Sequence, residues 1–245
     1  MRKIIAIWAA KLSAIAGRLL GKGSSAGPGT IALKICPDLI SRLKSNIKQK
    51  VIVTCGTNGK TTPNNLIYNA LKESGYSVLC NNQGANMISG IATAFALRCN
   101  WLGNFKADFA CLEVDEASTV KVFKYIKPDY IVITNLFRDQ LDRYGEIEHT
   151  MSLLKTAIDM SDKPTLILNG DDPLTASFGK DYNNAYYYGI SEKVLPVSVM
   201  LKRVSSAFTA ERSKNTIIYT TISWVIIIAL GVEINVHLLI LKQRM

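Results

Sequence analysis

The pattern of hydrophobic and polar positions is most regular between residues 51 and 169. Short, continuous apolar runs alternate there with longer stretches of mixed polarity. The apolar runs are VIVTC (51–55), YSVLC (76–80), DFACLEV (108–114), DYIVITN (129–135) and PTLILN (164–169). Runs of this kind are typical of parallel strands that are buried on both faces. The intervening segments, such as residues 60–74 ending at Gly75, predict helices, so we expect an α/β domain with a mostly parallel sheet.

Polar residues stand where these predicted strands end. Glu113, Asn135 and Asn169 each lie at or near the end of an apolar run, and a glycine-rich loop follows VIVTC. The carboxyl ends of parallel strands meet at one edge of the sheet, and ligands of open α/β sheets bind at that edge. Four polar features on one edge therefore predict a ligand site there.

The N-terminal residues have a helical rather than a strand period. Apolar side chains recur at Ile5, Trp8, Leu12, Ile15 and Leu19, with Lys11 and Arg18 between them. The two cations interrupt the apolar stretch, which the core of a secretory signal does not tolerate. We expect an amphipathic helix that packs on the domain, with a place on a membrane surface as an alternative role. Because KGSSAGPGT (22–30) predicts a flexible break, residues 1–50 are interpreted as this helix and a linker.

Composition narrows the class of partner. The chain has 245 residues and a net charge of +10, which favours anionic partners such as nucleotides or phospholipid headgroups. No basic run with interleaved aromatic residues is present, so we expect no nucleic acid. The five cysteines form no C-x-x-C pair, which indicates a reduced, cytoplasmic protein.

The glycine-rich loop has the chemistry of a phosphate site. GTNGKTT comprises Gly56, Thr57, Asn58, Gly59, Lys60, Thr61 and Thr62. A strand, a glycine turn and a helix N-terminus present backbone N–H groups to phosphate oxygens, and a lysine in this position reaches the β and γ phosphates. Thr54 replaces the first glycine of the usual G-x-x-x-x-G-K-[ST] pattern, and Pro63 follows closely. Neither change abolishes the site. Gly56 and Gly59 still allow the backbone to approach the phosphates closely, and proline is tolerated in the first turn of a helix.

Two residues are candidates for holding a magnesium ion. The hydroxyl of Thr61 is placed to ligate Mg²⁺ beside the phosphates. Glu113, at the end of a neighbouring strand, can hold the same ion directly or through water. The alternative interpretation of Glu113 is a surface acid within the run EVDEA.

Four motifs in fixed order resemble one enzyme family. GTNGKTT, EVDEA, TNLFRDQLDRYGE and NGDDP are similar to the central ATP-binding domain of Mur ligases. NNQGANMISGIATAF and the N-terminal segment narrow the resemblance to the MurT-type subunit of lipid II isoglutaminyl synthase, over about residues 4 to 190. Gln140 stands where many Mur ligases have a histidine near a second Mg²⁺, and glutamine is the MurT-type residue there.

The resemblance implies an ATP-dependent amide ligase of peptidoglycan synthesis. ATP would phosphorylate the α-carboxylate of D-glutamate in lipid II, and ammonia from a GatD-type glutamine amidotransferase would give D-isoglutamine. By position, residues 56–62 would hold the phosphates, Thr61 and Glu113 the Mg²⁺, and Asn169 the adenine, with Asp172 a weaker candidate. The resemblance assigns no catalytic residue. The resemblance implies a cytoplasmic protein, with a position at the inner face of the cell membrane as an alternative. The protein would then contact the membrane only peripherally, through its lipid substrate.

Residues 191–245 depart from that resemblance. The family continues with a four-cysteine zinc ribbon and a C-terminal domain, whereas residues 193–245 contain no cysteine, so the zinc ligands are absent. One interpretation is a membrane span, but the apolar run from Ile217 to Val232 is shorter than the roughly 20 residues that a spanning helix needs. The other interpretation is a frameshift in the coding DNA. Shifting the frame allows cysteines at the positions of Ala207, Ala210, Ala229 and Val232, which is a zinc-ribbon spacing.

We favour the frameshift, and three functional hypotheses follow. The first is a ligase subunit by descent with residues 51–190 as its ATP-binding domain, expected to lack ligase activity as a truncated chain. The second is a membrane-anchored P-loop nucleotide-binding protein whose C-terminal segment is genuine. The third is a nucleotide-binding remnant without function.

Overall fold

A computed structural model describes residues 1–21, 25–81, 85–136 and 146–189 of the chain. Gln140 and the whole segment 191–245 lie outside these residues. The frameshift, the zinc-ribbon positions that it restores and the alternative of a membrane span therefore remain sequence predictions.

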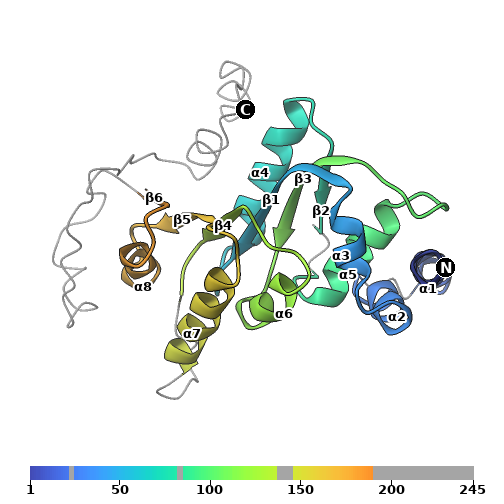
Figure 1. The fold of residues 1–245 in the computed structure, drawn as a ribbon, viewed down its shortest axis with the longest axis horizontal. Helices are drawn as coiled ribbons and strands as arrows, with labels where there is room; N and C mark the ends of the chain where they lie inside the picture. The colour runs from blue at the N-terminus through green and yellow to red at the C-terminus, as the bar shows by residue number, and fades with distance from the viewer. Residues whose placement is uncertain (22–24, 82–84, 137–145, 190–245) are drawn as a thin grey trace.

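A six-stranded parallel sheet forms the centre of the molecule (Figure 1). Its strands are β1 (Ile47–Cys55), β2 (Val78–Cys80), β3 (Ala107–Glu113), β4 (Tyr130–Ile133), β5 (Thr165–Asn169) and β6 (Ala185–Tyr188). Their order is β2-β3-β1-β4-β5-β6, and every neighbouring pair is parallel. The predicted α/β class is confirmed, and all five apolar runs contain a strand. β6 was not predicted, although its aromatic run AYYY has high strand propensity.

Helices cover both faces of this sheet. α4 (Thr61–Glu73) packs Ile67 and Leu71 against Ile52 and Phe109 on one face. The opposite face is covered by α5 (Ile88–Arg98), α6 (Thr119–Phe123) and α7 (Glu146–Asp159). The short elements η1 (Glu116–Ser118), α8 (Pro173–Ser177) and η2 (Phe178–Lys180) complete the connections. Coverage on both faces explains why the strands read as continuous apolar runs rather than alternating ones.

The N-terminal segment belongs to the same hydrophobic core. α1 (Arg2–Leu19), α2 (Gly27–Ile35) and α3 (Leu39–Lys44) pack with α5, and the predicted packing of the N-terminal helix on the domain is confirmed. The expected break is shorter than the sequence indicated, because residues 27–30 form the first turn of α2. Pro28 fits that turn, where its missing N–H costs no helical hydrogen bond.

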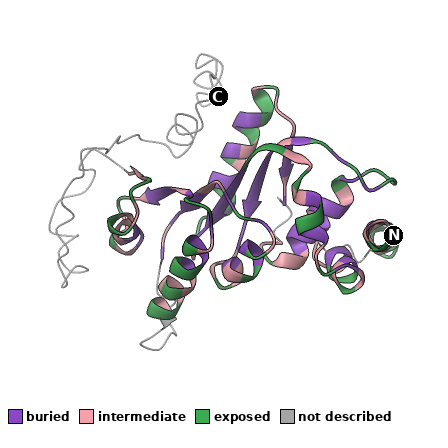
Figure 2. Cartoon of the chain, in the orientation of Figure 1, coloured by how far each residue is buried: buried purple, intermediate pink, exposed green. Residues whose placement is uncertain are grey.

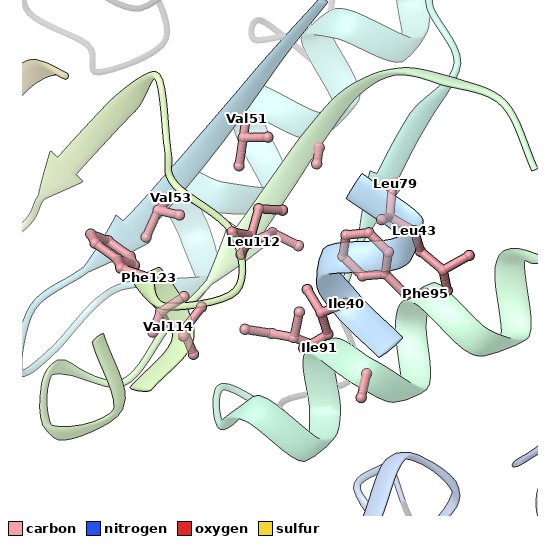
Figure 3. Packing of buried hydrophobic residues seen from close by; sticks show 14 of the residues in the cluster. Ile40, Leu43, Val51, Val53, Leu79, Ile91, Phe95, Leu112, Val114 and Phe123 are labelled. Atoms are coloured by element: carbon pink, nitrogen blue, oxygen red, sulfur yellow. The ribbon is translucent and has the colours of Figure 1, made fainter. Parts of the chain in front are cut away.

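The larger core cluster lies between the sheet and these helices (Figures 2 and 3). Figure 3 shows Ile40 and Leu43 of α3 facing Phe95 of α5, with side chains of β1 and β3 beside them. The rings of Phe95 and Phe105 meet edge to face, with centroids 5.9 Å apart. Within the described residues, no helix has the length and apolar character needed to cross a bilayer.

Gly29 allows α2 to touch α5 and gives a test of this packing. A Cβ at residue 29 would lie 1.8 Å from the carbonyl oxygen of Ser89, and the Gly29 N–H donates to Thr93 Oγ1 at 2.8 Å. We expect Gly29→Ala to lower the free energy of unfolding by about 1–3 kcal/mol, measured by denaturant titration, because the helices must move apart. Thr30→Ala, on the exposed side of α2, is the control and should change stability by less than about 0.5 kcal/mol. Equal stability of both variants would contradict this account of the contact.

Candidate functional site

The predicted site residues meet at the carboxyl edge of the sheet, where the strand order changes direction. β1 is central, and the chain reaches β3 on one side of it and β4 on the other. In the register, Thr54 pairs with both Glu113 and Val132, so the loop after β1 opens between two neighbouring strand ends. Ligands of doubly wound sheets bind at such a switch point.

The glycine loop needs its glycines for two different reasons. Gly56 and Gly59 both have positive φ, at 131° and 70°, which residues with a Cβ adopt at a cost. At Gly56 a Cβ would also lie 2.4 Å from Thr134 Oγ1 and 2.8 Å from the carbonyl oxygen of Asn135. Gly56 is therefore required by close contact with the end of β4, whereas Gly59 has open space around it.

The segment after β4 holds the loop in place through four hydrogen bonds. Asn135 accepts from the Asn58 N–H at 3.0 Å and donates to the Asn58 carbonyl at 2.9 Å. Its own carbonyl accepts from the Thr57 N–H at 2.8 Å. Thr134 Oγ1 also donates to the Asn58 carbonyl, at 2.8 Å. A loop fixed from a neighbouring strand keeps its conformation without a ligand, which reduces the cost of ordering it on binding.

Lys60 is the buried cation of the site. It caps the N-terminus of α4, and its side chain is 9% exposed. The ammonium donates to the carbonyl oxygens of Gly56 at 2.6 Å and Thr57 at 3.2 Å, and it forms an ion pair with Glu116 at 3.3 Å. The first turn of α4 holds no acidic residue. A lysine and a helix N-terminus together make this point of the edge favourable for an anion.

Glu113 is a buried residue whose carboxylate has no counter-charge within the part of the chain that the structure describes. The residue is 5% exposed at the end of β3, and its carboxylate forms no hydrogen bond or ion pair with any described residue. Burying an ionised carboxylate is costly unless a cation or hydrogen-bond donors accompany it. Its hard oxygen atoms suit Mg²⁺, as does the hydroxyl of Thr61, the first residue of α4. The described residues hold no cluster of three acidic, histidine or cysteine ligands, and a Mg²⁺ shared with phosphates needs only one or two protein ligands.

Asn81 fixes the position of Glu113 from the adjacent strand end. Its side-chain oxygen accepts from the Glu113 N–H at 2.8 Å, and its amide donates to the Glu113 carbonyl, also at 2.8 Å. The same amide donates to the carbonyl of Ala85 at 3.0 Å. Asn81 thus extends the pairing of β2 with β3 past the end of the strand and sets the direction of the Glu113 side chain.

Asn169 and Asp172 lie at the same edge, one strand further along. The Asn169 amide donates to the Thr134 carbonyl at 2.8 Å, and its oxygen accepts from the Asp171 N–H. The Asp172 carboxylate accepts from Leu136 N–H at 2.8 Å and caps α8. Both residues therefore brace the segment that holds the glycine loop. Their expected contacts with adenine stay predictions.

The two unusual residues of the loop have structural explanations. Thr54 is fully buried within β1, so it belongs to the strand rather than to the turn, and a glycine is not needed there. Pro63 lies in the first turn of α4, where its missing N–H costs nothing, as expected. The neighbouring Cys55 is no nucleophile, because burial raises the pKa of its thiol to about 12.

Sequence reasoning missed three residues of the site. Asn81 was not assigned, although it directly follows the run YSVLC in the same way that Asn135 ends DYIVITN. Thr134 and Glu116 act through contacts with residues more than 50 positions away, which no local pattern contains. A search for polar residues after every apolar run would have found Asn81.

Replacing Asn81 tests the support of Glu113. Asn81→Ala leaves the backbone N–H and carbonyl of Glu113 without these partners, at a cost of about 1–3 kcal/mol for each buried group left unpaired. We expect a lower free energy of unfolding in urea than for Asn86→Ala, whose side chain makes no hydrogen bond to a described residue. If both variants unfold at the same urea concentration, Asn81 does not support β3 in this way.

The Mur ligase middle domain matches residues 53–235 of this chain. The MurT subunit of lipid II isoglutaminyl synthase from Staphylococcus aureus (strain COL) is 39% identical over 191 residues, covering 78% of this chain and 42% of the relative. The MurT subunit from Streptococcus pneumoniae is 44% identical over 156 residues, covering 63% and 34%. This chain thus spans about two-fifths or less of the length of these relatives.

MurF ligase from Thermotoga maritima has a similar fold, with a TM-score of 0.53 at 21% identity over 66% of this chain and 37% of that one. Sequence and fold agree, and this chain belongs to the Mur ligase family.

Proposed function

We propose that this chain binds Mg²⁺ and ATP at the carboxyl edge of its sheet. The observation that carries the proposal is that one edge of the sheet holds both a buried ammonium, on Lys60, and a buried carboxylate, on Glu113. A buried lysine at the N-terminus of α4 favours phosphate, and the carboxylate of Glu113, which has no partner among the described residues, favours a cation. Loop residues 56–62 would hold the phosphates, and Thr61 and Glu113 the Mg²⁺. Asn169, and more weakly Asp172, are the residues proposed to lie near the adenine.

We further propose that this site serves an amide ligase acting on lipid II. Support comes from the 39% and 44% identity to MurT subunits. The γ-phosphoryl group of ATP would pass to the α-carboxylate of D-glutamate in the stem peptide and leave ADP. Ammonia would then attack the acyl phosphate, release inorganic phosphate and leave the amide of D-isoglutamine. Ammonia would come from a partner amidotransferase subunit, for which a GatD-type glutaminase is the specific proposal, and the reaction would take place in the cytoplasm.

The residues of this chain would contribute positioning and charge. Phosphoryl transfer depends chiefly on alignment of the reacting groups and on neutralisation of the charge that develops on the phosphate oxygens. Lys60 would supply one positive charge, and the N-terminus of α4, which follows a loop held by Thr134 and Asn135, would supply a fixed dipole. When bound, Mg²⁺ supplies further positive charge at the phosphates.

Lys60→Ala tests the nucleotide site directly. Removing the ammonium deletes a hydrogen bond between charged groups, so ATP binding in the presence of Mg²⁺ should weaken by about 1.5–3 kcal/mol in calorimetry. Lys72→Ala, an exposed lysine near the other end of α4, is the matched control and should bind ATP like the parent. Equal ATP affinity of Lys60→Ala and the parent would refute the proposed site.

The ligase proposal needs a separate assay, because ATP binding alone does not identify the reaction. Residues 1–189 can be fused to the remaining C-terminal part of the Staphylococcus aureus MurT subunit. With a GatD-type glutaminase, glutamine, Mg²⁺, ATP and lipid II, we expect a product that is about one dalton lighter, and no product from the Lys60→Ala fusion. A fusion that binds ATP but gives no amide would reject the ligase role while leaving the nucleotide site intact.

A further inference from the structure

The outward face of α1 is apolar and uncovered. Its large side chains Ile5, Trp8, Leu12, Ile15 and Leu19 are between 46% and 83% exposed. Their spacing of three or four residues places them in one line along the helix. We call these five residues the α1 stripe. Single exposed apolar residues are normal on a protein surface, whereas a continuous row of them indicates a contact site.

The stripe cannot turn inward, because the opposite side of the helix is already packed. Ala6, Ile7 and Ala10 are fully buried against the domain. Figure 1 shows α1 at the outer end of the molecule, beyond α2, and Figure 2 shows its exposed surface there. The helix is therefore fixed to a folded domain with its apolar stripe facing away from it.

The loop between α5 and β3 widens the apolar surface. Trp101 and Leu102 are 52% and 73% exposed, and the indole N–H of Trp8 donates to the Trp101 carbonyl at 2.7 Å. The ammonium of Lys11 lies 5.5 Å from the centre of the Trp101 ring. Two tryptophans thus stand side by side at the stripe. Tryptophan is favoured at membrane interfaces because its ring is apolar and its N–H is polar.

The charges around the stripe are all positive. α1 carries four basic residues and no acidic residue, and the first acidic residue of the whole chain is Asp38. At about 100° per residue, Lys11 and Arg18 fall on one side of the stripe and Arg2 on the other. An apolar stripe flanked by two cations on one side and one on the other matches the surface of a bilayer with acidic headgroups, which is anionic outside and apolar beneath.

We propose that α1 docks onto an anionic phospholipid surface, with the stripe and Trp101 in the headgroup region. A second copy of the chain fits this face less well, since stacking two stripes would bring cations of both copies together. A protein partner would need a matching acidic rim. This inference goes beyond the proposed function and does not rest on it, because neither ATP nor ligase chemistry is involved.

Vesicle binding by the full chain tests the proposal. The parent protein should co-sediment with vesicles of phosphatidylcholine containing 30% phosphatidylglycerol and bind pure phosphatidylcholine vesicles at least tenfold more weakly. The variant Leu12→Glu/Ile15→Glu places two carboxylates in the stripe and should lose at least tenfold in affinity for the anionic vesicles. Leu66→Glu/Met87→Glu, at exposed apolar positions elsewhere, is the matched control and should bind like the parent. Every variant retains residues 190–245, so differences between variants report on α1.

A charge variant keeps the test valid if the stripe variant folds poorly. Arg2→Gln/Arg18→Gln changes only exposed side chains and should lower affinity for anionic vesicles by roughly tenfold or more. Circular dichroism checks that each variant is folded. Three results would overturn the proposal: unchanged vesicle binding by both α1 variants, equal affinity of the parent for neutral and anionic vesicles, or an equal loss in the control variant. A stripe variant that turns a dimer into a monomer without affecting vesicle binding would instead identify a second copy as the occupant.

Discussion

The attachment of the glycine loop to the end of β4 is the interaction on which the site depends. Thr134 and Asn135 hold the loop through hydrogen bonds to Thr57 and Asn58, and they leave no space for a side chain at residue 56. The loop therefore has its conformation because β4 lies beside β1. That neighbour relation in turn requires the chain to cross from β3 over to the other side of β1. A local motif of seven residues thus relies on the topology of the whole sheet.

The same edge explains where the charges lie. Backbone pairing between parallel strands ends where the strands end. Beyond that point side chains such as Asn81 form the hydrogen bonds to the backbone of the neighbouring strand. Asn81 binds the backbone of Glu113 only, so it makes no use of the Glu113 carboxylate. Burying an acid costs stability unless a cation or hydrogen-bond donors accompany it, and among the described residues the Glu113 carboxylate has neither. Lys60, which is paired with Glu116, and Glu113 lie at one edge of the sheet, where we propose that an anion and a cation bind together.

The fold was largely predictable because its strands are buried on both faces. Each of the five apolar runs became a strand, and the polar residues that ended them came together at one edge as expected. β6 was missed because its tyrosines are only partly buried, so no continuous apolar run marks it. Helix α2 was missed, and residues up to 50 were interpreted as a linker, because Gly27, Pro28 and Gly29 at its start look like a loop. They are helical since Gly29 packs tightly against α5, and that contact is between residues 64 positions apart. The same limit concealed the contacts of Thr134 and Glu116, whereas Lys60 and Glu113 were visible from local sequence.

The ion pair of Lys60 with Glu116 sets a condition on how the site works. The ammonium already has three acceptors, two of them loop carbonyls, so a phosphate does not meet a bare cation. If phosphate binds at Lys60 as proposed, its oxygens replace the carboxylate of Glu116, and the net affinity is the difference between two charge-assisted contacts. Such an exchange gives less affinity than a free lysine would, yet it keeps the buried charge compensated before the nucleotide arrives. Glu116, in η1, follows Glu113 by three residues. A ligand that displaces Glu116 from Lys60 would therefore also act on the end of β3, which holds Glu113. The two halves of the site, phosphate and cation, are thus coupled through one short stretch of chain, EVDEA.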